Sequence, residues 1–205
     1  MIKKIILLFL ILTSPYLFAG QGEGVSAQGN FGLPSSQITN PDGSTAFYSG
    51  IGLKADLSIP LYTPGGFATA FRLNIKYLDL QNSANSSSQR ETGNHIGGGA
   101  GLKLNFYRIF MTYDFNVMKA RHFFVGDINH YLEYDYNSAG YSVGLEFSTS
   151  KTFSGVISYS INSGNIPKAA TGFTSDSSYS DSLIWIGVKY KTGLPFGKFL
   201  ESIFK

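Results

Sequence analysis

The chain has 205 residues and a formal net charge of +3; 43% of its residues are hydrophobic, 15% are aromatic and only 14% are charged. A soluble helical domain would carry more charge, since soluble domains average about 25% charged residues, and a disordered chain would be far less hydrophobic. The absence of cysteine excludes disulfides, thiolate metal sites and a cysteine nucleophile.

The first predicted element is a secretory signal peptide over residues 1–19. Lys3 and Lys4 precede the apolar run Ile5–Leu12, and the small residues Ala19 and Gly20 provide a cleavage site. The apolar run is too short to span a bilayer, and a retained short anchor is the alternative interpretation. Without Lys3 and Lys4, the 16 Lys and Arg residues become 14 against 13 Asp and Glu, so a nucleic-acid partner is not expected.

The next predicted domain, residues 20–193, consists of strands. Apolar and polar residues alternate with a period of two in segment after segment, which is the pattern of a strand with two unlike faces. Eight segments are near the ~9–11 residues that a tilted membrane-crossing strand requires. In chain order they are 25–33, 47–61, 67–77, 96–106, 109–117, 141–148, 153–162 and 184–190.

The connections between these strands differ in length. Long polar connections are expected at Pro34–Thr45, Gln81–Asn94, Lys119–Ser138 and Ser163–Asp181, and short turns at Tyr62–Gly66, Phe106–Arg108 and Ser150–Thr152. Long loops at one end and short turns at the other are typical of an outer-membrane barrel with both termini in the periplasm.

Aromatic residues indicate which face of the barrel is outside. On the apolar face they gather near both strand ends, with aliphatic residues between them: Phe31, Phe47, Tyr77, Phe115, Tyr141 and Tyr159 toward the long loops, and Phe67, Phe106, Phe147, Phe153 and Tyr190 toward the short turns. Two aromatic girdles match the two interfaces of a bilayer. A soluble, lipocalin-like barrel has no reason to sort them in this way.

The polar face is then expected to line the interior. Its charged members are Lys54, Asp56, Arg72, Lys76, Lys103, Asp114, Glu146 and Lys189. Because an eight-stranded barrel is nearly filled by its own side chains, these residues are interpreted as a polar core of paired charges. A narrow permeation path is the alternative, since inward glycines such as Gly50, Gly99 and Gly144 leave room beside Arg72 and Trp185 or simply let the strands coil tightly.

With a signal peptide, eight alternating strands, four long loops and three short turns, the chain resembles the small outer-membrane barrel superfamily, of the OmpA-barrel, OmpX and OmpW kind. No family-specific motif matches residue by residue. The resemblance implies an all-β, transmembrane, antiparallel up-and-down barrel in the outer membrane of a Gram-negative cell. It also implies insertion by the barrel-assembly machinery into outer-membrane lipid and lipopolysaccharide.

The C-terminal residues 194–205 depart from that resemblance, because such barrels usually end on a strand with a terminal aromatic residue. Phe196, Phe199, Leu200, Ile203 and Phe204 recur at helical spacing. We expect a periplasmic tail with a short amphipathic helix on the inner-leaflet surface. A plain extension or a longer final strand is the alternative.

No catalytic residue, cofactor or metal is predicted. No serine lies two positions after His95, so the His-x-Ser arrangement of outer-membrane lipid A deacylases is absent, as is the Asp/His pairing of omptin proteases. A serine, a histidine and an acidic residue could still meet in the folded chain, but no spacing of these residues along the sequence indicates such a catalytic set. Asp127, His130 and Glu133 recur every three residues and would share a face if helical, which is a weak cation motif.

The most distinctive loop is Lys119–Ser138. We predict that it forms a contact surface for an extracellular ligand or protein, or continues as strands above the membrane, with His122, Phe123, Phe124, His130, Tyr131 and Tyr134 as its contact residues. The predicted function is a non-enzymatic, integral outer-membrane protein that acts in envelope integrity or surface interaction through its outer loops. The alternative is a narrow, porin-like channel of the OmpW kind for small apolar or ionic solutes.

Overall fold

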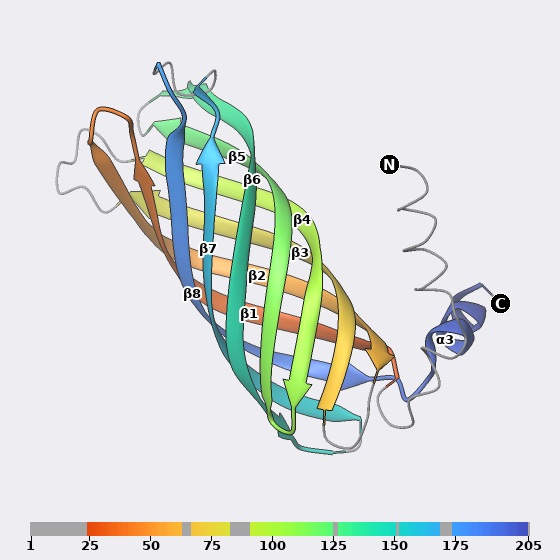
Figure 1. Cartoon of the computed structure of the whole chain (residues 1–205). Helices are drawn as coiled ribbons and strands as arrows, with labels where there is room; N and C mark the ends of the chain where they lie inside the picture. Colours follow the sequence, from red (N-terminus) through yellow and green to blue (C-terminus); the bar gives the residue numbers. More distant parts are fainter. Residues whose placement is uncertain are drawn as a thin grey trace, which may run out of the picture.

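The computed structural model describes residues 24–62, 67–82, 91–124, 127–150, 152–168 and 174–204. Within them, eight antiparallel strands close into one barrel in which each strand pairs with its sequence neighbours and the first pairs with the last (Figure 1). The elements are β1 (Ser26–Thr39), β2 (Thr45–Tyr62), β3 (Phe67–Asn82), β4 (Glu91–Phe106), β5 (Ile109–Phe124), β6 (Asp127–Ser148), β7 (Phe153–Ile166), β8 (Ser177–Lys191) and the helix α3 (Phe196–Ile203).

The predicted fold class is therefore confirmed: the chain is an all-β, antiparallel up-and-down barrel with a short C-terminal helix. The predicted signal peptide, residues 1–19, lies outside the described residues. No helix in the described part of the chain is long and apolar enough to cross a membrane.

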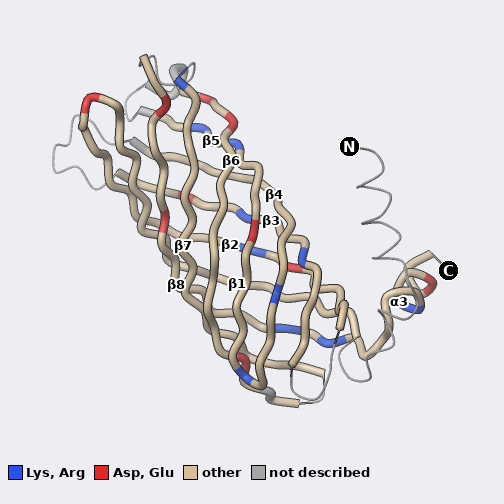
Figure 2. The backbone as a smooth tube through the Cα atoms, viewed as in Figure 1, with Lys and Arg blue, Asp and Glu red and all other residues tan. Residues whose placement is uncertain are grey.

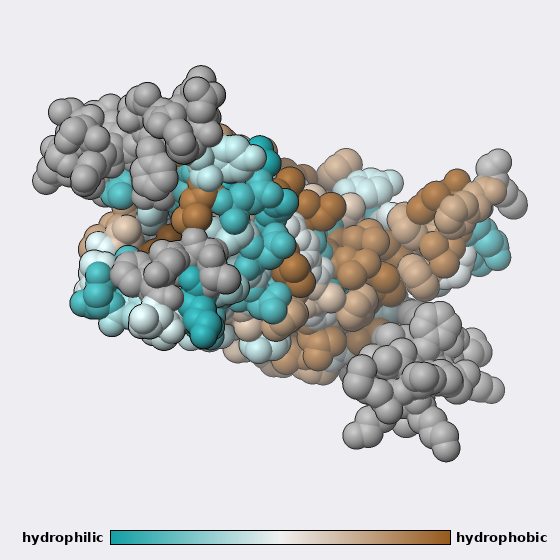
Figure 3. Space-filling view, turned by 90° about the horizontal axis from the view of Figure 1, so that it is seen from above, coloured by the Kyte–Doolittle hydropathy of each residue, from teal (hydrophilic) through white to brown (hydrophobic). Residues whose placement is uncertain are grey.

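Exposed apolar side chains form a continuous outer surface, which we call the lipid-facing band. Neighbouring strands contribute to it at matched heights: Phe67 pairs with Phe106 and Phe153 with Tyr190 at the short-turn end. Figure 3 shows the brown band beside α3 and the hydrophilic surface at the opposite end. The band comprises Phe31, Leu33, Phe47, Ile51, Leu53, Phe67, Leu73, Ile75, Ile96, Leu102, Leu104, Phe106, Ile109, Met111, Tyr113, Phe115, Val117, Tyr141, Val143, Leu145, Phe147, Phe153, Ile157, Tyr159, Ile161, Ile184, Ile186, Val188 and Tyr190.

The strands are longer than a membrane requires. Where they leave the lipid-facing band, the apolar side chains move from the outward face to the inward face. The longest, β6, has 22 residues, against the ~9–11 that cross a bilayer. On β5 the outward residue Val117 is followed on the same face by charged Lys119, whereas the inward residue Asn116 is followed by Met118. Outside the band the solvent is water, so the apolar side chains turn inward as in a soluble barrel.

This inversion explains why the predicted loop bounds were too wide. Much of Lys119–Ser138 belongs to strands, since β5 reaches Phe124 and β6 begins at Asp127. Similarly, β1 and β2 leave only residues 40–44 between them. Apolar and polar residues still alternate in these segments, but here the apolar residues point inward and the polar residues outward. A pattern search that expects apolar residues on the outward face therefore interprets such a segment as an irregular polar loop.

Candidate functional site

All eight charged residues that were predicted to face inward lie buried inside the barrel. Figure 2 shows such charged positions at several heights along the strands. One further buried carboxylate, Asp181, had been placed at the end of a loop. The described interior therefore holds five cationic and four acidic side chains that are each less than a tenth exposed.

The layer nearest the short turns is organised by Glu146 on β6. Its two carboxylate oxygens accept from Lys189 Nζ (3.0 Å) and from Lys191 Nζ (2.8 Å), both on β8. The ammonium group of Lys103 lies 4.3 Å from the centroid of the Phe110 ring, a cation–π contact. The layer thus places one carboxylate among three ammonium groups.

The middle layer is a bridge across the lumen built on Arg72 of β3. Its Nη2 contacts Asp56 Oδ1 of β2 at 2.5 Å, and its Nη1 donates to Asp114 Oδ2 of β5 at 2.8 Å. The remaining oxygen of Asp56 accepts from Asn30 Nδ2 at 2.8 Å. A guanidinium with donors in a fixed fork suits two carboxylates that come from separate strands.

Trp185 of β8 fills the lumen beside this bridge. Its Nε1 donates to Ser160 Oγ at 2.9 Å, and the Lys54 ammonium lies 4.8 Å from its ring centroid. The ring occupies space left by two glycines: a Cβ atom on Gly32 would lie 2.4 Å from Trp185 Cε3, and one on Gly52 would lie 3.0 Å from its Cη2. The glycines are thus needed for close approach to this ring.

Gly32→Ala is expected to lower the free energy of unfolding by about 1–3 kcal/mol, because the added methyl group overlaps the Trp185 ring. Gly29→Ala is the matched control on the same strand, since a Cβ atom there meets nothing within 4 Å. Urea unfolding followed by the fluorescence of Trp185, the only tryptophan, measures both variants. Equal stability of the two variants would contradict the packing argument.

The next layer outward centres on Asp181. One of its oxygens accepts from Tyr179 Oη (2.7 Å) and contacts Lys76 Nζ (3.4 Å), while the other accepts from Asn162 Nδ2 (2.5 Å). A cavity of about 10 Å³ lies between this layer and the Arg72 bridge, with room for about one water molecule. The lumen at this height is therefore filled by its own side chains.

Two histidines form the polar part of the outer end of the interior. The Nε2 atoms of His95 and His122 are 2.9 Å apart, His95 Nδ1 is 2.8 Å from Tyr136 Oη, and His122 Nε2 is 2.9 Å from Tyr134 Oη. His122 Nε2 contacts both His95 Nε2 and Tyr134 Oη, and a neutral ring nitrogen has either one lone pair or one proton, so these two contacts share a single hydrogen-bonding position.

Apolar side chains surround these histidines and close the outer end, in a cluster we call the outer plug. Its members come from seven of the eight strands and are nearly inaccessible: Ile38, Tyr48, Leu78, Leu80, Met118, Ala120, Tyr134, Tyr136, Ile166, Tyr179, Leu183 and Trp185. Dense apolar packing of this kind excludes water from the space between the strands. The interior thus changes from charged layers near the short turns to an apolar seal near the outer loops.

The outer plug corrects part of the predicted contact surface. His122 and Tyr134 are buried inside the barrel, because the inverted polarity of β5 and β6 turns their face inward. Tyr131 is 52% exposed and Phe123 is half-buried, with their ring centroids 5.9 Å apart. The side chains of Phe124 and His130, and of Asp127 in the cation motif, lie outside the described residues.

The outer face of the β5–β6 hairpin, above the lipid-facing band, carries a charged cluster. Glu133 contacts Lys119 Nζ at 2.5 Å and Arg121 Nη2 at 2.6 Å. The Arg121 guanidinium carbon lies 4.9 Å from the centroid of the Tyr131 ring. We call Lys119, Arg121, Phe123, Tyr131 and Glu133 the hairpin patch; it is a water-exposed surface with both charged and aromatic groups.

Hydrogen bonds from Lys119 and Arg121 lower the pKa of Glu133 below its ordinary value. Because the pKa is depressed in the folded protein, these bonds stabilise the hairpin patch above the unfolded pKa and are lost as the pH falls through the folded pKa. An NMR titration of the Glu133 carboxyl carbon is expected to show the lowered pKa, and Lys119→Ala should raise it. An unchanged pKa in Lys119→Ala would contradict this pairing.

The interior histidines lie within hydrogen-bonding distance of buried side chains. Both ring nitrogens of His95 are engaged, one with a tyrosine and one with His122. Among the described residues, no group of three His, Cys, Asp or Glu side chains is placed to hold a metal ion. The contacts that are present serve to satisfy buried polar atoms.

Comparison with known proteins identifies the fold. No family model and no curated protein matches the chain. Neisserial surface protein A matches with a TM-score of 0.53 and 15% identity, covering 82% of this chain and 99% of that chain. Ail, the attachment invasion locus protein of Yersinia pestis, in complex with the heparin analogue sucrose octasulfate, matches with a TM-score of 0.50 and 12% identity over the same shares of the two chains.

At this level of identity the likeness is one of fold. The chain has the fold of the small eight-stranded outer-membrane barrels, as the resemblance implied. The location in the cell outer membrane stays a prediction from the sequence.

Proposed function

We propose that this chain is an integral protein of the outer membrane that acts, without enzymatic activity, by presenting the hairpin patch and the adjoining loops for surface interaction. The observation that carries the proposal is the contrast between the lumen of the barrel and the outer face of the β5–β6 hairpin. The described lumen holds ion pairs around Arg72, Asp181 and Glu146 together with the buried side chains of the outer plug. In contrast, β5 and β6 extend beyond the lipid-facing band with an exposed charged and aromatic face.

The composition of the hairpin patch supports a binding role. Tyrosine and arginine are enriched at protein interfaces, because they offer a large contact area together with hydrogen-bond donors. Tyr131 and Arg121 lie side by side on a rigid antiparallel hairpin, which lowers the entropic cost of binding. The two proteins of the same fold are, by their names, a surface protein and an attachment protein.

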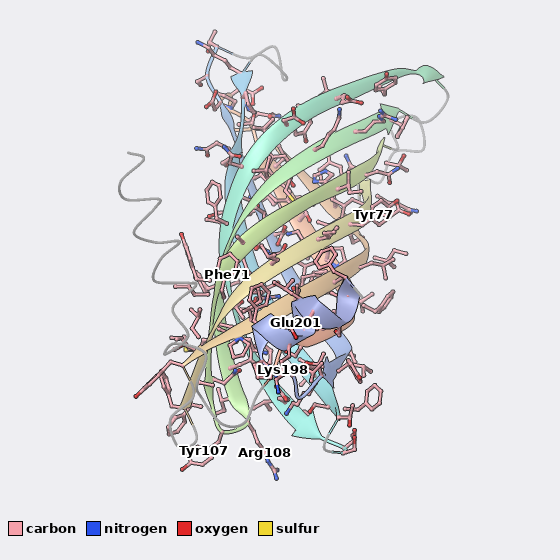
Figure 4. All side chains as sticks on the ribbon, turned by 90° about the vertical axis from the view of Figure 1, so that its right-hand side faces the viewer. Phe71, Tyr77, Tyr107, Arg108, Lys198 and Glu201 are labelled. Atoms are coloured by element: carbon pink, nitrogen blue, oxygen red, sulfur yellow. The ribbon has the colours of Figure 1, made fainter. Side chains whose placement is uncertain are left out.

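Retention of cells on a coated surface tests this role. Cells producing the protein are compared on matrix protein and on sulfated polysaccharide, and Arg121→Ala/Tyr131→Ala is expected to abolish any retention that exceeds that of cells lacking the protein. Tyr107→Ala/Arg108→Ala is the matched control, since this exposed Tyr-Arg pair lies in the turn at the opposite end of the barrel (Figure 4). Retention equal to that of cells lacking the protein on both coatings would contradict the proposal.

Electrical recording separates this proposal from the channel alternative. We expect no steady single-channel steps from the purified protein in a planar bilayer, because the side chains of Arg72 and the outer plug occupy the lumen. Steady steps that change when Arg72 or Lys103 is replaced by Ala would favour the channel. Release of an acyl chain from lipopolysaccharide or phospholipid would instead contradict the absence of enzymatic activity.

A further inference from the structure

The C-terminal helix α3 is amphipathic, and part of its apolar face is exposed. Phe196, Phe199, Leu200 and Ile203 recur at the i, i+3, i+4, i+7 spacing of one helix face, and on this face Leu200 is 37% and Ile203 is 56% exposed. An isolated helix of eight residues is marginal in water, since helices shorter than about 12–15 residues rarely form alone. The exposed side chains of Leu200 and Ile203 therefore favour an apolar environment.

The chain that leads into α3 is held firmly against the start of β1. The amide of Val25 donates to Leu194 O (2.9 Å), and both Thr192 N (3.0 Å) and Thr192 Oγ1 (2.7 Å) donate to Val25 O. Leu194 N in turn donates to Thr192 Oγ1 at 3.1 Å. These bonds join the start of β1 to the chain that follows β8, at the short-turn end of the β1–β8 seam, so α3 begins at a defined place on the barrel rim.

A positive φ of +67° at Gly193 turns the chain at this point. A Cβ atom at Gly24 would lie 2.3 Å from Leu194 N, so the two chain ends approach as closely as their backbones permit. The direction of the connection is therefore set by the backbone. Figure 1 shows α3 to the side of the short-turn end of the barrel, set off from the strands.

The lipid-facing band reaches this same rim. Tyr190 of β8 and Phe153 of β7 lie there with their ring centroids 5.3 Å apart, as part of the aromatic girdle expected at the headgroup level of the leaflet. Only residues 191–195 separate Tyr190 from α3. The apolar face of α3 thus begins only a few residues beyond the aromatic girdle of the lipid-facing band, while Lys198 and Glu201, labelled in Figure 4, lie on the other side of the helix.

We infer that α3 is an interfacial anchor, whose apolar face lies in the periplasmic leaflet and holds the β1–β8 seam at the headgroup level. The occupant of the apolar face is the lipid surface of that leaflet. This inference rests on the proposed membrane location of the barrel.

Fluorophore labelling tests the anchor, and the absence of native cysteine makes single-cysteine variants of the full mature chain straightforward. Leu200→Cys and Ile203→Cys report the apolar face, Glu201→Cys the polar face, and Ile186→Cys the lipid-facing band. Each labelled protein is placed in phosphatidylcholine nanodiscs, and quenching by doxyl-labelled lipid is compared with quenching by aqueous iodide.

We expect the probes at 186, 200 and 203 to be quenched by doxyl lipid at least about twofold more strongly than the probe at 201, with the reverse order for iodide. If only the probe at 186 meets lipid, and 200 and 203 are as open to iodide as 201, the anchor is refuted while the membrane location stands. Shielding of 200 and 203 from both quenchers would refute it as well, since a protein surface would then cover them. Absence of lipid quenching at 186 would overturn the membrane location itself.

Discussion

Replacement of Arg72 by Ala is expected to lower the free energy of unfolding by about 3–5 kcal/mol, the largest effect among the interior charges. Arg72 joins Asp56 and Asp114 across the lumen, and all three side chains are almost completely buried. Removal of the guanidinium leaves two carboxylates facing each other without a cation between them. Urea unfolding in detergent micelles, followed by Trp185 fluorescence, measures the loss.

Arg121→Ala is the matched control for Arg72. Arg121 also forms a short contact with a carboxylate, but on the water-exposed hairpin patch, where solvent screens the pair, so its loss should lower stability far less than the loss of Arg72. Substitution of Arg72 by Met together with Asp56→Asn and Asp114→Asn should recover most of the loss, because no unpaired charge remains. Equal losses for Arg72→Ala and Arg121→Ala would contradict the buried bridge.

His95→Ala is expected to lower the free energy of unfolding by about 2–4 kcal/mol, because it opens a space in the outer plug and removes partners of Tyr136 and His122. The two histidines share a hydrogen bond, so their substitutions should not be additive. In the cycle with His122→Ala, we expect a coupling energy of at least about 1 kcal/mol.

Chemical denaturation of the two single variants and the double variant measures this coupling. Costs that add to within about 0.5 kcal/mol would show that the histidines act independently, against the 2.9 Å contact between their Nε2 atoms. His95→Gln offers a milder comparison, since an amide retains a donor and an acceptor near Tyr136.

The polarity of the strands within the lipid-facing band was predictable from the sequence. Segments such as 67–77 alternate so regularly that parity placed Arg72 and Lys76 on one face and Phe71 and Ile75 on the other, and the aromatic girdles indicated that the second face is the outer one. The amphipathic spacing after Pro195 likewise indicated the helix that the structure contains. In both cases the signal is local, since it depends only on neighbours along the chain.

The outer plug and the hairpin patch were harder to predict. Tyr134 was interpreted as a surface residue because it lies among charged and aromatic neighbours, although it shares its parity with the inward Ser138. The useful signal was the unbroken alternation from Glu133 to Tyr141, combined with an exchange of polarity between the faces. Recognising it requires knowing where the membrane ends, and this depends on the barrel as a whole.

Eight amphipathic strands, their outward apolar side and charges of both signs in the lumen could be predicted from the residues, because a period of two assigns each side chain to one of two faces and the aromatic girdles indicate the outer one. Which of those charges meet became clear only from the folded barrel. Arg72 and Asp114 are 42 residues apart and lie on strands that are not adjacent, and Lys76 and Asp181 are 105 apart. Contacts across a lumen depend on the closure, tilt and stagger of the whole barrel, which no local pattern encodes.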